Sequence, residues 1–476
     1  MEGKYRYLLK NMGLMTISSF ASKILSFILV PLYTAILTTD EYGTYDIYTT
    51  TAFLLIPLLS VCISDAVLRF ALDKENEPSE VFSIGIMFYV RACVCVSILV
   101  VVNYIFGIIK VFNQYPIFFL SYYFLCLLSD ILTQFARGLE RISDVAISGI
   151  LSSVTTISLN ILFLLIIPLG IDGYFIANIS AFGITALYLF LRLHAWKYVK
   201  CHVTKDLKNK MVAYSSPLIL NQIGWWINNA SDRYIVTWLC GTAANGIYSV
   251  AYKIPSLLSV FQTIFNQAWT LSAVKELNEE ASHFYTNIYK IYNCGLVIVC
   301  SILIAADKII ARLLFANDFY EAWKYAPYLM LAVVFGSLSG LLGGIFTAAK
   351  DSKVIARTTA VGASVNTILN VIFVYIVGPI GAAIATLISY ILVWIVRLRK
   401  AKRAVIIDIC LPRDIVSYII MVFQAIILFI SNNLFLYALE TVAFLFLIII
   451  YFNDLKVIIL QLKRKVSIDK IQNTKI

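Results

Sequence analysis

The sequence predicts an all-α integral membrane protein of about fourteen transmembrane helices, arranged as two pseudo-symmetric six-helix lobes and two additional C-terminal helices. Three observations predict this fold class. Hydrophobic residues make up 61% of the 476 residues and charged residues only 14%, whereas a soluble domain carries roughly 25% charged residues. Apolar runs of about 20 residues follow one another along almost the whole chain. Short motifs also recur at a similar spacing in its two halves.

The expected spans are apolar runs bounded by polar residues, glycine or proline. In the first half they lie near 14–37, 44–69, 82–107, 116–136, 145–168 and 173–191. In the second half they lie near 213–239, 246–271, 284–305, 324–348, 356–377 and 380–396. Two further spans lie near 415–433 and 437–453. Little of the chain is left for a sizeable domain outside the membrane.

The basic residues predict the orientation of these spans. Most of the 38 Lys and Arg residues fall in alternate connections, whereas the connections on the other side hold only Lys110, Lys308 and Arg312. Because basic loops stay in the cytoplasm, both termini are expected there. These loops account for the net charge of +11 without a nucleic-acid partner, and they suit contact with anionic lipid.

The two halves of the chain share motifs about 200 residues apart, which indicates an internal duplication. Gly43 opens the second span and Gly246 the eighth, each followed by a Thr-Tyr or Ile-Tyr pair. A Gly-x-x-Gly-x-x-Ile-Ala pattern follows Asn160 in one half, and a matching pattern follows Asn370 in the other. Two copies of equal orientation predict a two-fold axis along the membrane normal, with a site between them.

The expected domains follow from this repeat. They are an N-terminal lobe at 1–196, a cytoplasmic linker at 197–210, a C-terminal lobe at 211–400, and two extra spans with a basic tail at 401–476.

Several positive charges fall inside apolar spans. Lys23 is the only charge in the run 14–37, and a cation at that depth costs at least about 2.5 to 3.5 kcal/mol unless it meets water or a partner. Ser19 and Lys23 share one face of that helix. Arg91 lies roughly 15 Å into the third span, and Arg233 and Lys253 lie in the seventh and eighth. These four cations predict a water-filled cavity that binds an anion. A structural ion pair of Lys23 with Asp65 or Asp130 is the alternative.

Other polar residues surround these cations in the sequence. Asp65 and Arg69 are four residues apart on one helix and are expected to pair with each other. In the seventh span, Asn229 and Arg233 share one polar stripe with Gln222 and Trp226, and Asp232 lies about 100° further round. The remaining supporting residues are Gln262, Asn266, Asn366 and Asn370. Sugar contact and hydrogen bonding between helices are both open to this group.

The sequence carries no catalytic constellation. It has no P-loop, no carboxylate pair with acid–base spacing, no histidine-based triad and no zinc motif. We therefore expect no catalytic residues, no metal site and no cofactor. An integral-membrane polymerase or ligase would also need a larger outer segment than residues 306–323.

Four groups of residues together resemble one family. They are Ser64 to Phe70 (SDAVLRF), Asn229 to Tyr234 (NASDRY), Gly246 to Pro255 (GIYSVAYKIP), and Asn366 with Asn370. In this order and frame the chain resembles the polysaccharide-flippase branch, O-antigen and capsule type, of the multidrug/oligosaccharidyl-lipid/polysaccharide exporter superfamily. The likeness covers nearly the whole chain and implies a MATE-like fold.

The resemblance implies a function and a location. The protein would move an anionic undecaprenyl-pyrophosphate-linked oligosaccharide from the cytoplasmic to the outer leaflet of a bacterial cytoplasmic membrane by alternating access. A polysaccharide polymerase and glycosyltransferases of the same pathway are the expected partners. Since no ATP site is present, a H⁺ or Na⁺ gradient or the membrane potential would supply energy. The potential contributes about 2.3 kcal/mol per charge per 100 mV.

Two relatives with the same fold are the alternatives. One is a flippase for the peptidoglycan precursor lipid II. The other is a cation-coupled multidrug antiporter, which needs a carboxylate deep in the first lobe. The first span offers Lys23 and no acid, which disfavours the antiporter.

Overall fold

The computed structural model describes residues 27–73, 75–200, 203–260, 262–263, 265, 281–348, 352–404, 408–430 and 433–456. Within these ranges the chain folds into helices and contains no β-strand. By packing it divides into two compact units, one of residues 1–246 with 316–318, the other of residues 247–315 with 319–476. The predicted lobes follow the sequence repeat instead, and their boundaries stay a prediction.

Each predicted span that falls in the described residues is matched by a helix. In unit 1 these are α2 (Val30–Ile36), α3 (Thr39–Ser60), α4 (Ile63–Ala71), α5 (Pro78–Phe106), α6 (Pro116–Gly138), α7 (Ile142–Ile161), α8 (Gly170–Arg192) and α9 (Lys205–Cys240). Helix α10 (Thr242–Ala251) begins in unit 1. Short segments η1 (Lys110–Asn113), η2 (Leu162–Ile166) and η3 (Ala195–Tyr198) join them.

Unit 2 contains the remaining helices of the described residues. They are α12 (Ala281–Ala305), α13 (Asp307–Leu314), α14 (Ala326–Ala348), α15 (Ser352–Val377), α16 (Pro379–Ala404), α17 (Leu411–Ile427) and α18 (Asn433–Ile450). The short segment η4 (Asn317–Lys324) begins in unit 1 and continues in unit 2. Eight described helices are long and apolar enough to cross a membrane, or nine if the bent pair α3–α4 counts as one span. The prediction of an all-α, multi-pass membrane protein is confirmed.

The second span is not one straight helix, as the sequence predicted for 44–69. It breaks between α3 and α4 with a bend of 59°. Val61 (φ 59°) and Cys62 (φ 49°) both adopt the left-handed conformation at the break, which is unfavourable for residues with a Cβ. Pro57, inside α3, supplies no backbone N–H and so removes one helical hydrogen bond just before the bend. The break sets the direction of α4, which carries Asp65 and Arg69.

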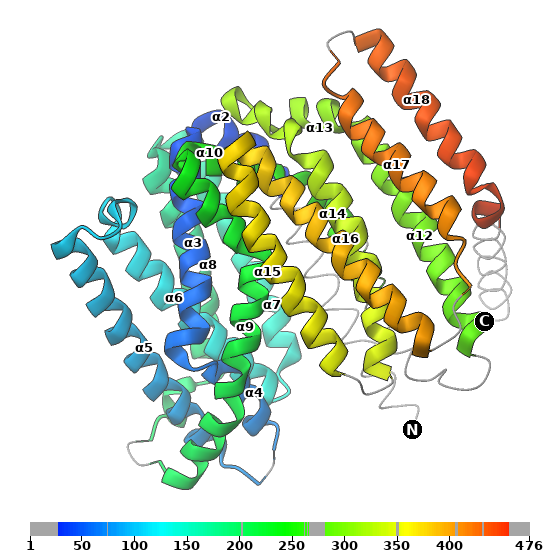
Figure 1. Cartoon of the computed structure of the whole chain (residues 1–476). Helices are drawn as coiled ribbons and strands as arrows, with labels where there is room; N and C mark the ends of the chain where they lie inside the picture. The colour runs from blue at the N-terminus through cyan, green and yellow to red at the C-terminus, as the bar shows by residue number, and fades with distance from the viewer. Residues whose placement is uncertain are drawn as a thin grey trace, which may run out of the picture. The chain divides into compact units, whose positions relative to one another are not determined.

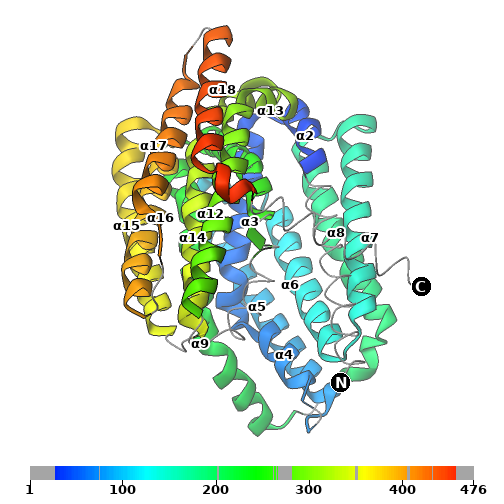
Figure 2. The same cartoon turned by 90° about the vertical axis from the view of Figure 1, so that its right-hand side faces the viewer.

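Two hairpins reproduce the sequence repeat in three dimensions. In unit 1, α7 and α8 turn at Gly170 (φ 58°), and in unit 2, α15 and α16 turn at Gly378 (φ 72°). Gly173 packs against Phe163, and Gly381 packs against Phe373. The two copies therefore share the turn and the close helix contact that follows it. Figure 2 shows α6, α7 and α8 side by side in unit 1.

In unit 2, α16 packs on both α14 and α15, and α12 packs on α14, α17 and α18 (Figure 1). The two C-terminal helices thus pack on α12.

The predicted linker 197–210 is held against the start of α5. The backbone N–H of Lys200 donates to Ser83 Oγ at 2.7 Å, and the Lys200 amine pairs with Glu77. The hydrogen bond from the Lys200 side-chain amine lowers the pKa of the Glu77 carboxyl. From Lys205 onward the linker is already helical, as the first turn of α9.

Candidate functional site

The polar stripe predicted on the seventh span lies along α9, which packs against α3 and α4. The Trp226 indole N–H donates to the Thr50 carbonyl at 2.9 Å. Two turns further on, the hydroxyls of Tyr234 and Thr51 share a hydrogen bond. The helices α3 and α9 are thus joined by polar contacts rather than by apolar packing alone. Such contacts are common between membrane helices.

Arg233 is the strongest of these links. Its Nη1 lies 2.7 Å from Asp46 Oδ1 and 3.3 Å from Thr50 Oγ1. The other carboxylate oxygen of Asp46 accepts from Asn245 Nδ2 at 3.2 Å. The side chains of Arg233 and Asp46 are 23% and 10% exposed. Asp46 therefore neutralises the Arg233 charge, so Arg233 is not an isolated cation, and its predicted contact with an anion stays a prediction.

A cavity of about 380 Å³ opens between α4 and α9. Its polar walls are Asp65, Arg69, Tyr214, Asn221 and Gln222, and leucines 68, 72 and 218 complete it. It therefore offers a guanidinium, a carboxylate, two amides and a phenol. These are the group types that recognise phosphate and sugar hydroxyls.

The expected ion pair between Asp65 and Arg69 does not form. Both residues lie in the described part of the chain, and no ion pair joins them there. Arg69 is exposed and Asp65 half-buried. Their shared helical face points both side chains into the cavity instead, so the Arg69 guanidinium keeps its donors available.

The other three cations predicted to bind an anion are Arg91, Lys253 and Lys23. Arg91 is exposed on α5, with its guanidinium 5.9 Å from the centre of the Phe88 ring. Lys253 is half-buried in unit 2, just after α10. Lys23 and Ser19 lie outside the described residues. A common cationic cavity thus stays a prediction.

The supporting polar residues divide between exposed and buried positions. Asn229 is exposed on α9, and the neighbouring Asp232 is buried and accepts from the backbone N–H of Arg233 at 3.0 Å. On α15, Asn370 Nδ2 donates to Asn366 Oδ1 at 3.0 Å, and Asn366 Nδ2 donates to Thr386 on α16 at 3.2 Å.

The last two supporting residues lie after α10. Gln262 is half-buried, and Asn266 lies outside the described residues.

Sequence reasoning missed several polar residues that the fold brings together. Asp46 and Asn245 were not singled out, although Asp46 is an acid near the start of an apolar span. Arg397 follows the predicted span 380–396 and so fell among the basic residues of a predicted connection, but it is buried on α16. It donates there to Thr358 Oγ1, Thr359 Oγ1 and the Ser339 carbonyl at 2.8 to 3.0 Å.

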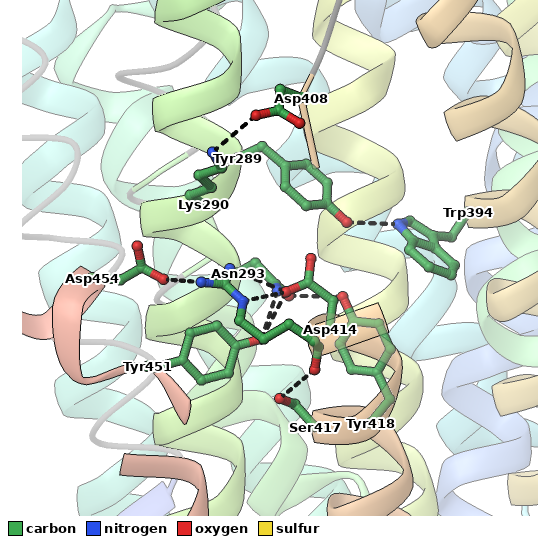
Figure 3. Close-up of polar contacts among 11 residues, drawn as sticks. Tyr289, Lys290, Asn293, Trp394, Asp408, Asp414, Ser417, Tyr418, Tyr451 and Asp454 are labelled. Carbon is green, nitrogen blue, oxygen red and sulfur yellow. Dashed lines mark hydrogen bonds and ion pairs between the residues drawn. The ribbon is translucent and has the colours of Figure 1, made fainter. Parts of the chain in front are cut away.

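Sequence reasoning also missed a polar cluster that joins α12, α17 and the residues after α18 (Figure 3). Tyr451 donates to Asp414 at 3.1 Å, Asn293 donates to Tyr451 at 3.0 Å, and Tyr418 donates to Asn293 at 2.8 Å. Arg413 pairs with both Asp414 and Asp454. Arg413 thus ties the start of α17 to the residues after α18, which indicates a structural role for this cluster.

No metal site is evident in the part of the chain that the structure describes. No three His, Cys, Asp or Glu side chains there are grouped to hold an ion.

Solved structures with the same fold are membrane transporters. The lipid II flippase MurJ in an inward closed conformation aligns with a TM-score of 0.69 at 16% identity, over 93% of this chain and 99% of that one. A multidrug resistance MATE family transporter of the MOP superfamily, in an inward-facing conformation, aligns with a TM-score of 0.66 at 16% identity, over 80% and 94%. A MOP superfamily transporter from Pyrococcus furiosus gives 0.52 at 15%, over 83% and 92%.

These likenesses show that the chain has the fold of these transporters. The sequence profile described as polysaccharide biosynthesis protein matches residues 8–270, and the MatE profile matches residues 217–372. The chain belongs to the polysaccharide biosynthesis protein family. A search of curated protein sequences gives no match.

Proposed function

We propose that this protein is a flippase for an undecaprenyl-pyrophosphate-linked oligosaccharide. It would work by alternating access in a bacterial cytoplasmic membrane, with both termini in the cytoplasm. The observation that supports this most is the α4–α9 cavity, where an available guanidinium lies beside two amides and a tyrosine. A guanidinium binds phosphate oxygens in a bidentate manner, and amides bind hydroxyls through both donor and acceptor atoms.

In this proposal Arg69 binds the pyrophosphate. Asn221 and Gln222 bind sugar hydroxyls, and Tyr214 covers one sugar face. Lys23, Arg91 and Lys253 add positive charge along the path of the headgroup. Arg233 acts mainly by fixing α9 on α3, since Asp46 holds its guanidinium. The lipid tail stays in the bilayer, and a H⁺ or Na⁺ gradient or the membrane potential drives transport.

Deletion and complementation test the proposal. Loss of the gene should abolish surface polysaccharide and cause the lipid-linked oligosaccharide to accumulate inside the cell. Complementation should fail with Arg69→Ala and weaken with Gln222→Ala, while the exposed-lysine control Lys353→Ala should restore display. Normal display by Arg69→Ala would remove the cavity from the proposal. Normal display by both Lys23→Ala and Lys253→Ala would count against the wider cationic path.

The second candidate is a flippase for lipid II. It is favoured by the MurJ alignment, which extends over 93% of this chain, against 80% for the MATE transporter with the TM-score of 0.66. Essentiality separates the two, because a lipid II flippase is required for cell-wall growth, whereas loss of a polysaccharide flippase leaves growth intact. For a multidrug antiporter, the third candidate, deletion would change drug sensitivity and leave surface polysaccharide unchanged.

A further inference from the structure

One charged group of the α4–α9 cavity has no part in the function proposed above. Asp65 lines this cavity together with Arg69, Asn221 and Gln222. It is half-buried, and within the described residues its carboxylate forms neither an ion pair nor a hydrogen bond. A partly buried carboxylate without a partner is unfavourable, and an ionisable side chain inside a membrane protein commonly marks a functional site.

The fold of α4 fixes the direction of the Asp65 side chain. The helix packs on α9 (Figure 1), and Ala66 and Val67, on one face of α4, are buried. Asp65, Leu68 and Arg69 share the opposite face, which lines the cavity. Asp65 therefore lies on the side of α4 that a ligand in the cavity would meet.

The cavity thus presents a separate cation and anion at a short spacing. Residues four apart on a helix have Cβ atoms about 5–6 Å from each other, yet in the described structure Asp65 and Arg69 do not pair. A guanidinium only donates hydrogen bonds, and an ionised carboxylate only accepts them. A ligand that satisfies both needs an anionic group beside Arg69 and, next to it, a donor group without negative charge beside Asp65.

The proposed substrate has two such neighbouring groups. Its pyrophosphate is joined to the first sugar through a single oxygen, so a pyrophosphate at Arg69 places that sugar beside Asp65. Hydroxyls of an uncharged sugar can donate to both carboxylate oxygens. A uronic acid in the same place would bring a second carboxylate against the first, and like charges at this spacing repel each other.

We propose that Asp65 is a specificity-determining residue that selects an uncharged sugar at the pyrophosphate and rejects an acidic one. Asp65 is the only acid among the described residues that line the cavity. Asn221 and Gln222 have both donors and acceptors, so they can bind a hydroxyl or a carboxylate and do not discriminate by charge. Selection by repulsion of the wrong ligand is a common source of specificity. This inference rests on the proposed function, since it assumes the pyrophosphate at Arg69.

Two soluble sugar nucleotides test the inference on the full-length protein in detergent. UDP-glucose and UDP-glucuronic acid both carry a sugar on a pyrophosphate, and they differ only at the sugar C6, which is a hydroxymethyl group in one and a carboxylate in the other. Isothermal titration calorimetry gives the two dissociation constants. The wild type should bind UDP-glucose about tenfold more tightly than UDP-glucuronic acid.

Three variants identify the residue responsible. Asp65→Asn removes the charge at nearly constant size, and it should bind the two probes with equal affinity. Glu75→Gln is the matched control, because Glu75 is an exposed acid just after α4 that does not line the cavity, and it should keep the tenfold preference. Arg69→Ala should weaken both probes equally, since they share the pyrophosphate. Thermal unfolding without ligand should give Asp65→Asn the wild-type midpoint, because no partner is lost.

The possible failures are distinguishable. If the wild type bound neither probe, the cavity would be removed as a pyrophosphate site, and the inference would fall with that part of the proposed function. Equal binding of the two probes by the wild type would overturn the selection and leave the pyrophosphate site in place. A tenfold preference that persisted in Asp65→Asn would show that Asp65 does not make the selection.

The oligosaccharide that accumulates in cells lacking the gene gives a second, independent measurement. Mild acid releases it from the pyrophosphate, and the sugar at its reducing end can then be identified. That sugar should be uncharged. A uronic acid at this position would contradict the inference even where the deletion confirmed a flippase.

Discussion

Gly43 and Gly246 make a reciprocal close contact. A Cβ on Gly43 would overlap the Thr242 carbonyl, and a Cβ on Gly246 would overlap the Thr39 carbonyl. Each glycine thus meets the residue four positions before the other, which is the contact expected of two related segments facing each other across a two-fold axis. The Thr242 hydroxyl also donates to Asp40. The starts of α3 and α10 therefore pack backbone to backbone.

Alanine at either glycine should destabilise this contact. Gly43→Ala and Gly246→Ala are each expected to cost about 1–3 kcal/mol through overpacking, seen as a lower thermal unfolding midpoint in detergent. Gly224→Ala, on α9, is the control, since in the described structure no atom beyond its chain neighbours and the nearby α9 backbone lies within 4 Å of its added Cβ. It should preserve or raise the midpoint, because alanine favours a helix by about 1 kcal/mol over glycine. Equal midpoints for Gly43→Ala and the control would rule out the close contact.

The Arg233–Asp46 ion pair should carry measurable stability. Arg233→Ala and Asp46→Ala are each expected to cost about 1.5–3 kcal/mol, the range for hydrogen bonds to charged groups. The double variant should cost less than the sum of the two, because each single variant leaves one charge without its partner. The comparison pair is Asp206 and Lys210 on α9, whose side chains are 76% and 63% exposed. Its coupling should be near zero.

A different outcome would change the role of Arg233. If Asp46→Ala left stability unaltered while Arg233→Ala abolished polysaccharide display, Arg233 would act on the substrate rather than as a link between α3 and α9.

The positions of the helices could be read from hydropathy, but the break at the end of α3 could not. Apolar runs set where a chain crosses the membrane, so each span within the described residues coincided with a helix. Pro57 was a visible signal of a weakened helix. The left-handed conformations of Val61 and Cys62 were not predictable, because such conformations are normally marked by glycine or asparagine.

Buried charges were visible in the sequence, but their partners were not. Arg233 and Asp46 are 187 residues apart, so their pairing depends on how α3 packs on α9. Arg397 follows directly after the apolar run 380–396, and only the continuation of α16 to Ala404 places it against Ser339 and Thr358. Asp65 and Arg69 had the spacing of an ion pair, yet both line the α4–α9 cavity without pairing there.

Relief of the left-handed conformation at Val61 should stabilise the protein. Val61→Gly removes a conformational cost of about 1–2 kcal/mol and adds a cost of about 0.5–1 kcal/mol in backbone entropy, so a gain of up to about 1.5 kcal/mol is expected. Val61→Ala keeps the Cβ and should show no such gain. The thermal unfolding midpoints of the two variants test this prediction. A lower midpoint for Val61→Gly than for Val61→Ala would contradict it.

The contact of Glu77 with Lys200 predicts that the stability of the folded protein depends on pH in the acidic range. The pKa of Glu77 is lower in the folded protein than in the unfolded chain. The contribution of Glu77 to folding stability is therefore complete above its pKa in the unfolded chain. It disappears as pH falls through its pKa in the folded protein. Glu77→Gln should lower the midpoint near neutral pH and have no effect in strong acid. Both residues are well exposed, so high salt should shrink the difference. A difference in midpoint between the wild type and Glu77→Gln that grows as pH falls would contradict this prediction.

Translocation in proteoliposomes tests the central claim most directly. The proposed substrate, the undecaprenyl-pyrophosphate-linked oligosaccharide, is extracted from cells that lack the gene. Its exposure on the outer face is followed with an impermeant glycan-cleaving enzyme. Wild-type protein should move it faster than protein-free vesicles, and Arg69→Ala should reduce the rate to that background. A wild-type rate equal to protein-free vesicles, or an undiminished rate with Arg69→Ala, would contradict the account.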